Sequence, residues 1–432
     1  MSMQNQLDNL SEAVASLGNG EARGRLERLF DEGTFMEMNR LACAEVVTGF
    51  GMVDGNPVYA FAQDRSVCSG AVGRAQGMKI RRVYELAAQN GAPLVALFDS
   101  DGARLGEGLD AMDAIAEILL ASNNLSGVVP QIAVVAGACV GSPAMIAANA
   151  DLTIYVEGAD YYLRSDETAA APAVTVADID SALDTVRHLL SLLPSNNLTA
   201  AVAYDFDSGA MPACDGIDDV LNAIADEDSL IRLYDGVCET ALARVGGTAC
   251  GLVAMKGDEI DCADASKVAR FVRLCDGFSL PLLTFVDAAG FRCLKGAAKV
   301  SHAYAEATTA KATGIVGRAF GPVYIAVAGK SAGADVVLAW PTAVISPLAP
   351  ETAVHILWKD RLAGMDDPTA DRAKLAKEYA GTEASPVTAA KSGCVTDVVT
   401  PAETRGRLIV LLEMLAGKRV SRLPKKHSNI QL

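Results

Sequence analysis

The chain compares with itself at a nearly fixed offset, and this repeat constrains the fold more than any other feature. A proline, an apolar run ending in aspartate and a glycine three residues later occur at 93–102 and again at 281–290, an offset of 188 residues. The segments GACVG (137–141) and GRAFG (317–321) match next, followed by ADLTIYV and ADVVLAW, at offsets of 180 and 184. Four matched elements in the same order indicate an internal duplication.

Each repeat predicts the same local structures. The runs PLVALF, QIAVVAG and PLLTFV are continuously apolar, as expected of strands with helices on both faces. Residues 109–125 carry apolar side chains at the spacing typical of a helix, and hairpin-like segments with DG and GG turns precede the repeats at 46–64 and 245–255. We therefore expect an α/β protein with two homologous domains, 1–235 and 236–432.

Composition excludes two classes of protein. The formal net charge of −16 argues against nucleic-acid binding, which requires a basic surface. With 51% hydrophobic but only 5% aromatic residues, the core must consist of Ala, Val, Leu and Ile. The longest apolar stretch, 128–156, is interrupted by polar residues and prolines, so we expect strand, turn, helix and strand rather than a membrane helix.

The ten cysteines contain no CxxC pair, and most lie in apolar runs, so we expect reduced, buried thiols. The first residues show neither a basic segment nor an apolar segment of a secretion signal. Both observations favour a cytoplasmic protein.

Side-chain chemistry of the usual kinds is nearly absent. There is no HExxH, Walker or GxGxxG motif, and no metal site is expected. The string GKSAG (329–333) fits the GxSxG pattern, but it follows a helix-like run and precedes a strand, the reverse of a nucleophile elbow. We interpret this match as chance.

Backbone groups are the remaining candidates. Each repeat carries two glycine-containing turns between an apolar strand and a helix, at 99–108 and 137–145 and again at 287–296 and 317–325. Small residues let the backbone approach a ligand, and helix N-termini present free N–H donors. Two such turns side by side could form an oxyanion hole. The alternative is that these glycines only connect strands to helices.

At this point the residues carry a resemblance. The sequence resembles the carboxyltransferase subunits of biotin-dependent acyl-CoA carboxylases and of sodium-pumping acyl-CoA decarboxylases, of the propionyl-CoA carboxylase beta and methylmalonyl-CoA decarboxylase alpha types. The resemblance covers nearly the whole chain, from RLERLFDEGTFMEM (25–38) through DSDGARLGEG and KVARFVRLCDGFSLPLLTFVD to KSAGADVVLAWPTA and the terminal RLPKKHSNIQL. It implies two tandem crotonase (ClpP)-type ββα superhelix domains.

The resemblance also implies the reaction. An acyl-CoA would bind the first domain, and biotin on a separate carrier protein would enter the second. Backbone holes would stabilise the thioester enolate and the ureido oxyanion of biotin. Further partners would be a biotin carboxylase or a membrane decarboxylase subunit, and a homo-oligomer (a dimer or a trimer of dimers) in which the first domain of one subunit faces the second of another. Membrane association would then come only through such a partner.

Site residues are carried over from the family position by position. On the acyl-CoA side, the catalytic turns would contain Gly102, Ala103, Gly141 and Ser142. Lys79 and Arg104 would bind the acyl-CoA, the alternative for Lys79 being a solvated surface lysine. The biotin side would contain Gly290, Phe291, Gly321, Val323 and Tyr324.

Two departures from the family pattern concern biotin. The family's Gly-Gly-Ala of the first domain becomes Gly141-Ser142-Pro143, in which Ser142 keeps its N–H although Pro143 loses a donor. In the second domain it becomes Gly321-Pro322-Val323, and Pro322 has no N–H at a position where the family uses one for biotin. The loop at 291–303 is also shorter than in most relatives. These departures leave open a biotin-independent acyl-CoA decarboxylase, or a non-catalytic scaffold subunit, as alternatives to the carboxyltransferase.

Overall fold

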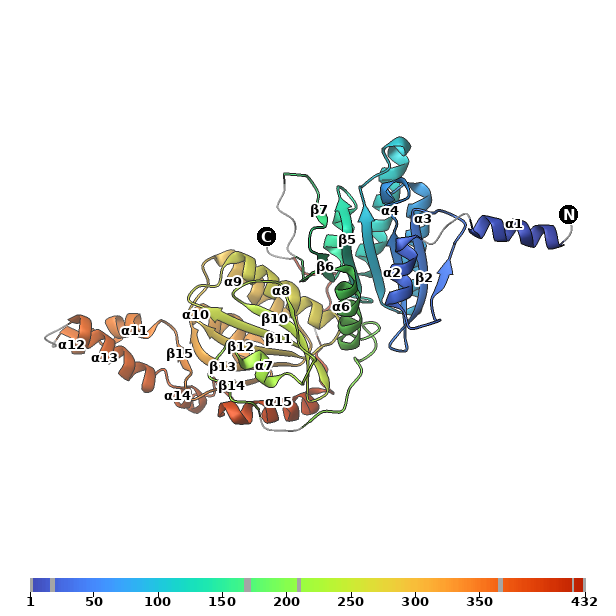
Figure 1. Cartoon of the computed structure of the whole chain (residues 1–432). Coiled ribbons are helices and arrows are strands. Elements are labelled where there is room, and N and C mark those ends of the chain that lie inside the picture. The colour runs from blue at the N-terminus through green and yellow to red at the C-terminus, as the bar shows by residue number, and fades with distance from the viewer. Residues whose placement is uncertain are drawn as a thin grey trace. The chain divides into compact units, whose positions relative to one another are not determined.

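The computed structural model describes residues 3–15, 20–166, 172–207, 211–363, 368–421 and 423–429. The chain divides into two compact units, Met1–Ala201 and Val202–Leu432, each built on an eight-stranded sheet (Figure 1). Within the described ranges, no helix is both long and apolar enough to cross a membrane.

The first sheet begins with an antiparallel hairpin and continues with parallel strands, in the order β1-β2-β3-β4-β5-β6-β8, with β7 paired to β5. Its strands are β1 Met36–Met38, β2 Val46–Val53, β3 Asn56–Gln63, β4 Leu94–Ser100, β5 Gln131–Val140, β6 Leu152–Val156, β7 Asp160–Tyr162 and β8 Val174–Val176. Its helices are α1 Met3–Ala15, α2 Glu21–Leu29, α3 Arg74–Asn90, α4 Leu109–Leu125, α5 Ala144–Asn149 and α6 Ile179–Leu192, with short 3₁₀ turns at Cys68–Gly70 and Leu105–Glu107.

The second sheet repeats this plan in the order β16-β14-β13-β12-β11-β10-β9, with β15 paired to β13. Its strands are β9 Ile231–Leu233, β10 Glu239–Val245, β11 Thr248–Gly257, β12 Leu282–Ala288, β13 Lys311–Phe320, β14 Val336–Ala339, β15 Val344–Ser346 and β16 Asp397–Val398. Its helices are α7 Val220–Ile224, α8 Cys262–Gly277, α9 Leu294–Glu306, α10 Gly321–Val323, η3 Tyr324–Ala328, η4 Lys330–Ala332, α11 Pro350–Leu357, α12 Lys359–Ala363, α13 Pro368–Gly381, α14 Pro386–Lys391 and α15 Pro401–Leu415.

The predicted hairpins are confirmed. Asp54 and Gly55 have φ of 48° and 77° and join β2 to β3, whereas Gly246 and Gly247, with φ of 60° and 72°, join β10 to β11. A two-residue turn with both φ values positive matches the right-handed twist of the strands it connects, and it favours Asp-Gly and Gly-Gly.

Each sheet buries continuous apolar strands, as their composition predicts. All seven residues of β4 are buried, and its side chains alternate between the two faces. Leu94, Ala96 and Phe98 pack in one cluster with residues of α3 and α4. In the second unit, Leu283 and Phe285 of β12 pack in a cluster with α7 and α15. The strands therefore have helices against both faces, which is the arrangement that continuously apolar runs require.

The helix pairs that follow the hairpins pack very closely in both units. A β-carbon at Gly77 of α3 would lie 2.6 Å from the Ala114 Cβ of α4, and one at Gly296 of α9 would lie 2.9 Å from the Ala265 Cβ of α8. Gly77 and Ala265 are separated by 188 residues, the offset of the repeat. The glycine is therefore on the first helix of the pair in one unit and on the second helix in the other, and the two helices approach closely in both.

A helical insertion distinguishes the second unit. Helices α11 to α14 lie between β15 and β16, and Figure 1 shows α11, α12 and α13 lying beyond β15, to one side of the sheet of that unit. They share a small core that includes Val354, Leu375 and Tyr379. The Trp358 ring meets the Tyr379 ring edge to face at a centroid distance of 5.5 Å.

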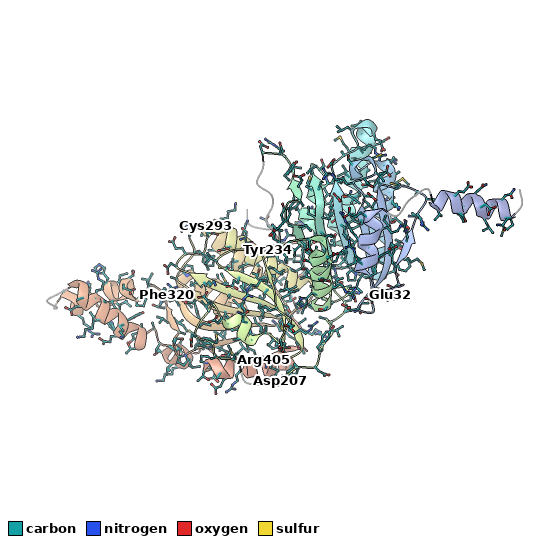
Figure 2. All side chains as sticks on the ribbon, in the orientation of Figure 1. Glu32, Asp207, Tyr234, Cys293, Phe320 and Arg405 are labelled. Carbon is teal, nitrogen blue, oxygen red and sulfur yellow. A yellow bond between two sulfur atoms is a disulfide. The ribbon has the colours of Figure 1, made fainter. Side chains whose placement is uncertain are left out.

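The segment after Ala201 packs with the second sheet. Arg405 of α15 donates to the carbonyl oxygen of Asp207 (3.0 Å) and pairs with Asp226 (2.7 Å); Asp207 and Arg405 are labelled in Figure 2. Asp226 in turn accepts from the backbone N–H groups of Gly246 and Gly247. The boundary between the two compact units therefore lies between Ala201 and Val202. That the acyl-CoA side and the biotin side divide at residue 235 stays a prediction.

The expectation that all cysteines are reduced is wrong for one pair. Cys262 and Cys293, the latter labelled in Figure 2, form a disulfide with Cα atoms 6.2 Å apart. A parallel bridge between Ile260 and Phe291 brings the two chain segments together two residues earlier, although 31 residues separate the cysteines in sequence. Eight cysteines of the described ranges are free, and of these only Cys68 and Cys394 are exposed.

Candidate active site

Two turns lie side by side at the carboxyl ends of β4 and β5. Gly102 has a φ of 109°, and a β-carbon there would lie 3.2 Å from the carbonyl oxygen of Val140. Gly141, with a φ of 69°, begins the second turn. The backbone can approach this closely only because position 102 is glycine, for which this conformation carries no strain.

Hydrogen bonds fix the first turn and leave one amide unused. The N–H of Val72 donates to the Gly102 carbonyl oxygen (2.8 Å), and the N–H of Arg104 donates to the Val72 carbonyl oxygen (2.9 Å). The Gly102 N–H donates to Ser100 Oγ (3.2 Å). Among the described residues, the N–H of Ala103 has no hydrogen-bond partner.

The second turn presents a second amide. The Gly141 N–H donates to the Tyr162 carbonyl oxygen (3.0 Å), whereas the Ser142 N–H has no partner in the described part of the chain. The sequence placed Gly141 and Ser142 together in the hole. In the structure the two residues differ, because the Gly141 N–H is already engaged and, within the described residues, the Ser142 N–H is not. Two free N–H groups on adjacent turns are the arrangement that stabilises an oxyanion.

Arg104 is partly exposed beside this site and is already paired. Its guanidinium contacts the carboxylates of Glu45 and Glu107, the latter at 3.3 Å. The hydrogen bond to Glu45 raises the pKa of Arg104. Glu107 also accepts from the N–H of Arg74, the first residue of α3, at 2.6 Å. A phosphate that recruited Arg104 would therefore compete with two carboxylates.

Lys79 lies inside the first unit, neither on its surface nor in an open site. It is 3% exposed, and its Nζ donates to the carbonyl oxygens of Val46 (2.7 Å) and Cys43 (3.1 Å). Burial lowers the pKa of this amino group. Lys267, at the same place in the repeat, donates to the carbonyl oxygen of Asp235. Because Lys79 is buried and bonded to the first carbonyl of β2, the alternative of a solvated lysine is wrong. Its predicted role in CoA binding stays untested.

The first turn of the second unit matches that of the first. The N–H of Ile260 donates to the Gly290 carbonyl oxygen and the N–H of Arg292 donates to the Ile260 carbonyl oxygen, both at 2.9 Å. In the described residues the Phe291 N–H has no partner, just as the Ala103 N–H has none. Helix α9 begins at Leu294, shortly after this turn.

The next turn of the second unit differs from its counterpart. Gly321 has a φ of 36°, and a β-carbon there would lie 2.7 Å from the Pro347 carbonyl oxygen, so this position also requires glycine. Pro322 takes the place of Ser142 and supplies no N–H. Val323 follows with a buried side chain. At the position of Ser142 the second unit therefore has no N–H donor, whereas in the described residues the free N–H of Phe291 matches that of Ala103.

A hollow of about 290 Å³ lies beside this turn. Its lining includes Gly321, Tyr324, Ile345, Pro347 and one charged residue, Glu383, and apolar atoms dominate the lining. The Tyr324 hydroxyl donates to the Cys394 carbonyl oxygen (3.1 Å), and burial raises the pKa of Tyr324 to about 12. The hollow is therefore suited to an uncharged ring.

These features define the class: two tandem crotonase-type units, each with oxyanion-type turns at the ends of adjacent parallel strands. The carboxyl transferase domain matches residues 15–171 and 168–430, so the chain belongs to the carboxyltransferase family. The resemblance found in the sequence is confirmed.

Individual relatives match over essentially their full length. The chain is 34% identical to the methylmalonyl-CoA decarboxylase subunit alpha of Propionigenium modestum, over 96% of this chain and 94% of that one. It is also 34% identical to the carboxyltransferase subunit of propionyl-CoA carboxylase from Haloferax mediterranei, over 100% of both. The crystal structure of transcarboxylase 12S with methylmalonyl-coenzyme A and methylmalonic acid bound superposes with a TM-score of 0.91 at 31% identity, covering 100% of this chain and 99% of that one.

The sequence reasoning missed two groups of residues around the turns. It did not identify the carboxylates of Glu45 and Glu107 that hold Arg104, because their meeting depends on the fold. Asp99 and Asp287 served only to align the repeats, although an acidic residue at the end of an apolar strand is itself a signal of a fixed polar contact.

Proposed function

We propose that this chain transfers a carboxylate between biotin and an acyl-CoA thioester, with the acyl-CoA in the first unit and biotin in the second. The observation that carries the proposal is the pair of unpartnered N–H groups of Ala103 and Ser142 in a chain that matches carboxyltransferases end to end. Removing a proton or a carboxylate from the α-carbon of a thioester leaves an enolate. Backbone amides on two adjacent turns would stabilise its oxygen without any side-chain nucleophile.

The residues of the second unit fit a biotin ring. The hollow beside Gly321 and Tyr324 is apolar and of a size that small ligands occupy, and the Phe291 N–H is available to a carbonyl oxygen. Biotin supplies a ureido nitrogen that carries the carboxylate. The task of Phe291 is to donate to the ureido oxygen while that bond is made or broken. The missing donor at Pro322 makes this half weaker than the acyl-CoA half.

Partners follow from the same reasoning. We propose that biotin arrives on a separate carrier protein, and that a biotin carboxylase or a membrane decarboxylase subunit completes the complex. The chain itself would be cytoplasmic and would form a homo-oligomer. The relative of known structure named above is described as a hexamer.

The test is carboxyl transfer by the purified full-length chain. Carboxylated biotin carrier is mixed with acetyl-, propionyl- or crotonyl-CoA, and malonyl- or methylmalonyl-CoA is offered for the reverse direction. Ser142→Pro removes the proposed donor, whereas Ser142→Ala keeps the N–H and serves as the control. We expect roughly 100-fold to 1000-fold lower kcat for the proline variant only. Equal activity of the two variants would refute the assignment of this amide.

Pro322 favours one second candidate, a biotin-independent decarboxylase of malonyl-type CoA thioesters. Such an enzyme would use Ala103 and Ser142 in the same way, but the carboxylate would leave as carbon dioxide and a proton would take its place on the α-carbon of the enolate. It predicts release of carbon dioxide from malonyl-CoA in the absence of carrier, unaffected by avidin. Strict dependence on biotin would exclude it.

A further inference from the structure

An aspartate lies at the base of each pair of turns, and its side chain is buried in the first unit (Asp99) and partly exposed in the second (Asp287). In the first unit Phe98 pairs with Val135 and Ser100 pairs with Cys139, so Asp99 of β4 faces three residues of β5, 136–138. In the second unit Val286 pairs with Ile315 and Ala288 with Ala319, which leaves Asp287 opposite 316–318. Both sheets therefore contain the same bulge at the same place.

The aspartate side chain fills the space that each bulge opens. Asp99 Oδ1 accepts the N–H of Ala138 (3.1 Å), and a β-carbon at Gly137 would lie 2.4 Å from that oxygen. Asp287 Oδ1 accepts the N–H of Arg318 (2.9 Å), and a β-carbon at Gly317 would lie 2.5 Å from the Asp287 Cγ. A glycine is thus required in each bulge, because the carboxylate occupies the space of its side chain.

In each unit, the two residues joined by this hydrogen bond lie the same number of residues before the two turns. Ala103 lies four residues after Asp99, and Ser142 lies four residues after Ala138. In the second unit Phe291 and Pro322 stand at the same separations from Asp287 and Arg318. A contact that fixes the two strand ends therefore fixes the spacing of the two turns beyond them, and with it the spacing of the Ala103 and Ser142 amides in the first unit.

We propose that Asp99 and Asp287 are positioning residues, each of which sets the spacing of the two turns of its own unit through one carboxylate-to-amide hydrogen bond across the bulge. The inference rests on the proposed function for its catalytic consequence, but the geometry of the bulge does not depend on that function. An error of about 1 Å in the position of an oxyanion donor costs roughly 100-fold in rate. The hydrogen bond made by each aspartate lies at the strand ends, which is where such an error in position would arise.

The cations that neutralise the two aspartates belong to different elements in the two units. Asp99 Oδ2 accepts from Arg25 Nη1 of α2 at 2.9 Å, and both side chains are about nine-tenths buried. Asp287 accepts from Arg318 Nε (2.8 Å), which belongs to the bulge itself and also pairs with Asp258. Variants of the first unit must therefore remove the cation together with the anion, since a lone buried charge would destabilise the fold by itself. The partly exposed pair of the second unit is changed in the same way for comparison.

The experiment compares two uncharged pairs in the first unit. The double variant Asp99→Asn with Arg25→Met keeps an oxygen that accepts the Ala138 N–H, whereas Asp99→Leu with Arg25→Met has a similar shape and no acceptor. We expect the Leu variant to have roughly 100-fold lower kcat for carboxyl transfer from malonyl- or methylmalonyl-CoA to biocytin. The Asn variant should lie close to the wild type.

The equivalent comparison in the second unit separates the two sites. Asp287→Leu with Arg318→Met should raise the KM for biocytin relative to Asp287→Asn with Arg318→Met, and leave the KM for the CoA thioester unchanged. As a control for the loss of an ion pair alone, Asp31→Leu with Arg187→Met should lower the Tm without changing kcat. If kcat falls only in proportion to Tm in all these variants, the positioning role is overturned.

Hydrogen exchange keeps the test independent of the reaction. In the first-unit Leu variant, peptides covering 137–145 should exchange faster than in the Asn variant, while the beginning of β5 keeps its protection. Unchanged exchange at 137–145 would overturn the positioning role of Asp99 even if the enzyme is active. If the wild type transfers no carboxylate to any acceptor, the proposed function fails. The exchange data still decide whether the Asp99 carboxylate holds the end of β5 in place.

Discussion

Gly77 of α3 lies against Ala114 of α4 so closely that a β-carbon on the glycine would come within 2.6 Å of the alanine Cβ. We expect Gly77→Ala to destabilise the protein by about 1–2 kcal/mol, because overpacking costs about 1–3 kcal/mol and the gain in helix propensity offsets only part of it. The free energy of unfolding in urea measures this.

The second unit supplies the control for that variant. Gly77→Ala combined with Ala114→Gly recreates the arrangement of Ala265 and Gly296. The double variant should regain most of the lost stability. If it is no more stable than Gly77→Ala alone, the close approach of the two helices is not the cause.

Pro322→Ser should strengthen the biotin side. The substitution gives the second unit an N–H at the position where the first unit has Ser142, so a ureido oxygen would gain a second donor. We expect a lower KM for biocytin and an unchanged KM for the CoA thioester in steady-state assays. Pro322→Ala supplies the same N–H without a hydroxyl and should behave alike; a difference between them would implicate the hydroxyl instead.

Lys79→Met should affect stability rather than substrate binding. The carbonyl oxygens of Cys43 and Val46 would lose their donor, at a cost of about 1–3 kcal/mol. Lys79 is the only lysine of the first unit, so a CoA in that unit would depend on arginines or on cations from elsewhere. A higher KM for the CoA thioester at unchanged Tm would contradict this assignment.

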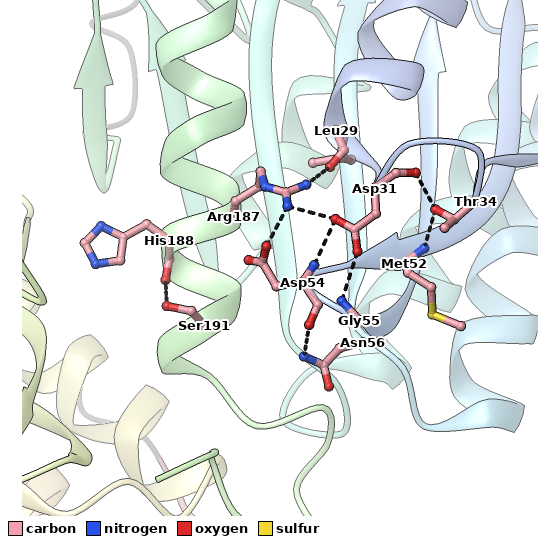
Figure 3. A network of polar contacts seen from close by, with 10 residues as sticks. All are labelled: Leu29, Asp31, Thr34, Met52, Asp54, Gly55, Asn56, Arg187, His188 and Ser191. Atoms are coloured by element: carbon pink, nitrogen blue, oxygen red, sulfur yellow. Dashed lines mark hydrogen bonds and ion pairs between the residues drawn. The ribbon is translucent and has the colours of Figure 1, made fainter. Parts of the chain in front are cut away.

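An acid-sensitive network links α6 to the first hairpin. Arg187 donates to Asp31 (2.8 Å) and Asp54 (2.6 Å), and Asp31 also accepts the N–H of Gly55 (2.9 Å; Figure 3). The hydrogen bond from Arg187 holds the pKa of Asp31 below its ordinary value of 3.8. This contribution to stability is complete above pH 3.8 and is lost as the pH falls through the lower, folded-state pKa.

Asp31→Asn tests that dependence. The variant should be less stable than the wild type at pH 7, and the difference should shrink as the pH falls below 4, as measured by thermal unfolding across that range. A difference that stays constant with pH would show that the carboxylate charge does not contribute.

Loss of the Cys262–Cys293 disulfide should lower stability by about 3–4 kcal/mol, given the 31-residue separation and the loop-entropy estimate. Cys262→Ser and reduction by a dithiol should have equal effects on unfolding in urea. Cys275→Ser, which alters a free buried thiol, controls for cysteine removal as such. No change on reduction would mean that the bond does not form in solution.

Helices and turns that depend only on neighbouring residues were predictable from the sequence. The segment 109–125 forms α4 with those bounds, and the DG and GG hairpins form at Asp54–Gly55 and Gly246–Gly247. The stretch 128–156 becomes β5, α5 and β6 because its polar residues and prolines fall at the ends of these elements or between them. In each case neighbouring residues determine the outcome.

Features that depend on distant contacts were not predictable. The burial of Lys79 follows from β2 passing over α3, and the disulfide follows from the bridge between Ile260 and Phe291. The candidate turns were found, but which amide of each is free was not. Gly141 and Ser142 are adjacent in sequence, and only the pairing of β5 with β7 shows that the former is already engaged.

The ion pair between Arg25 and Asp99 also determines where the chain can be cut. Helix α2 precedes the sheet and looks dispensable in sequence, yet its arginine neutralises a carboxylate inside the first unit. A shortened chain starting at β1 would leave that carboxylate buried without its partner. Truncations and domain transplants should therefore begin before Glu21, whereas the second unit carries its own cation, Arg318, and has no such requirement.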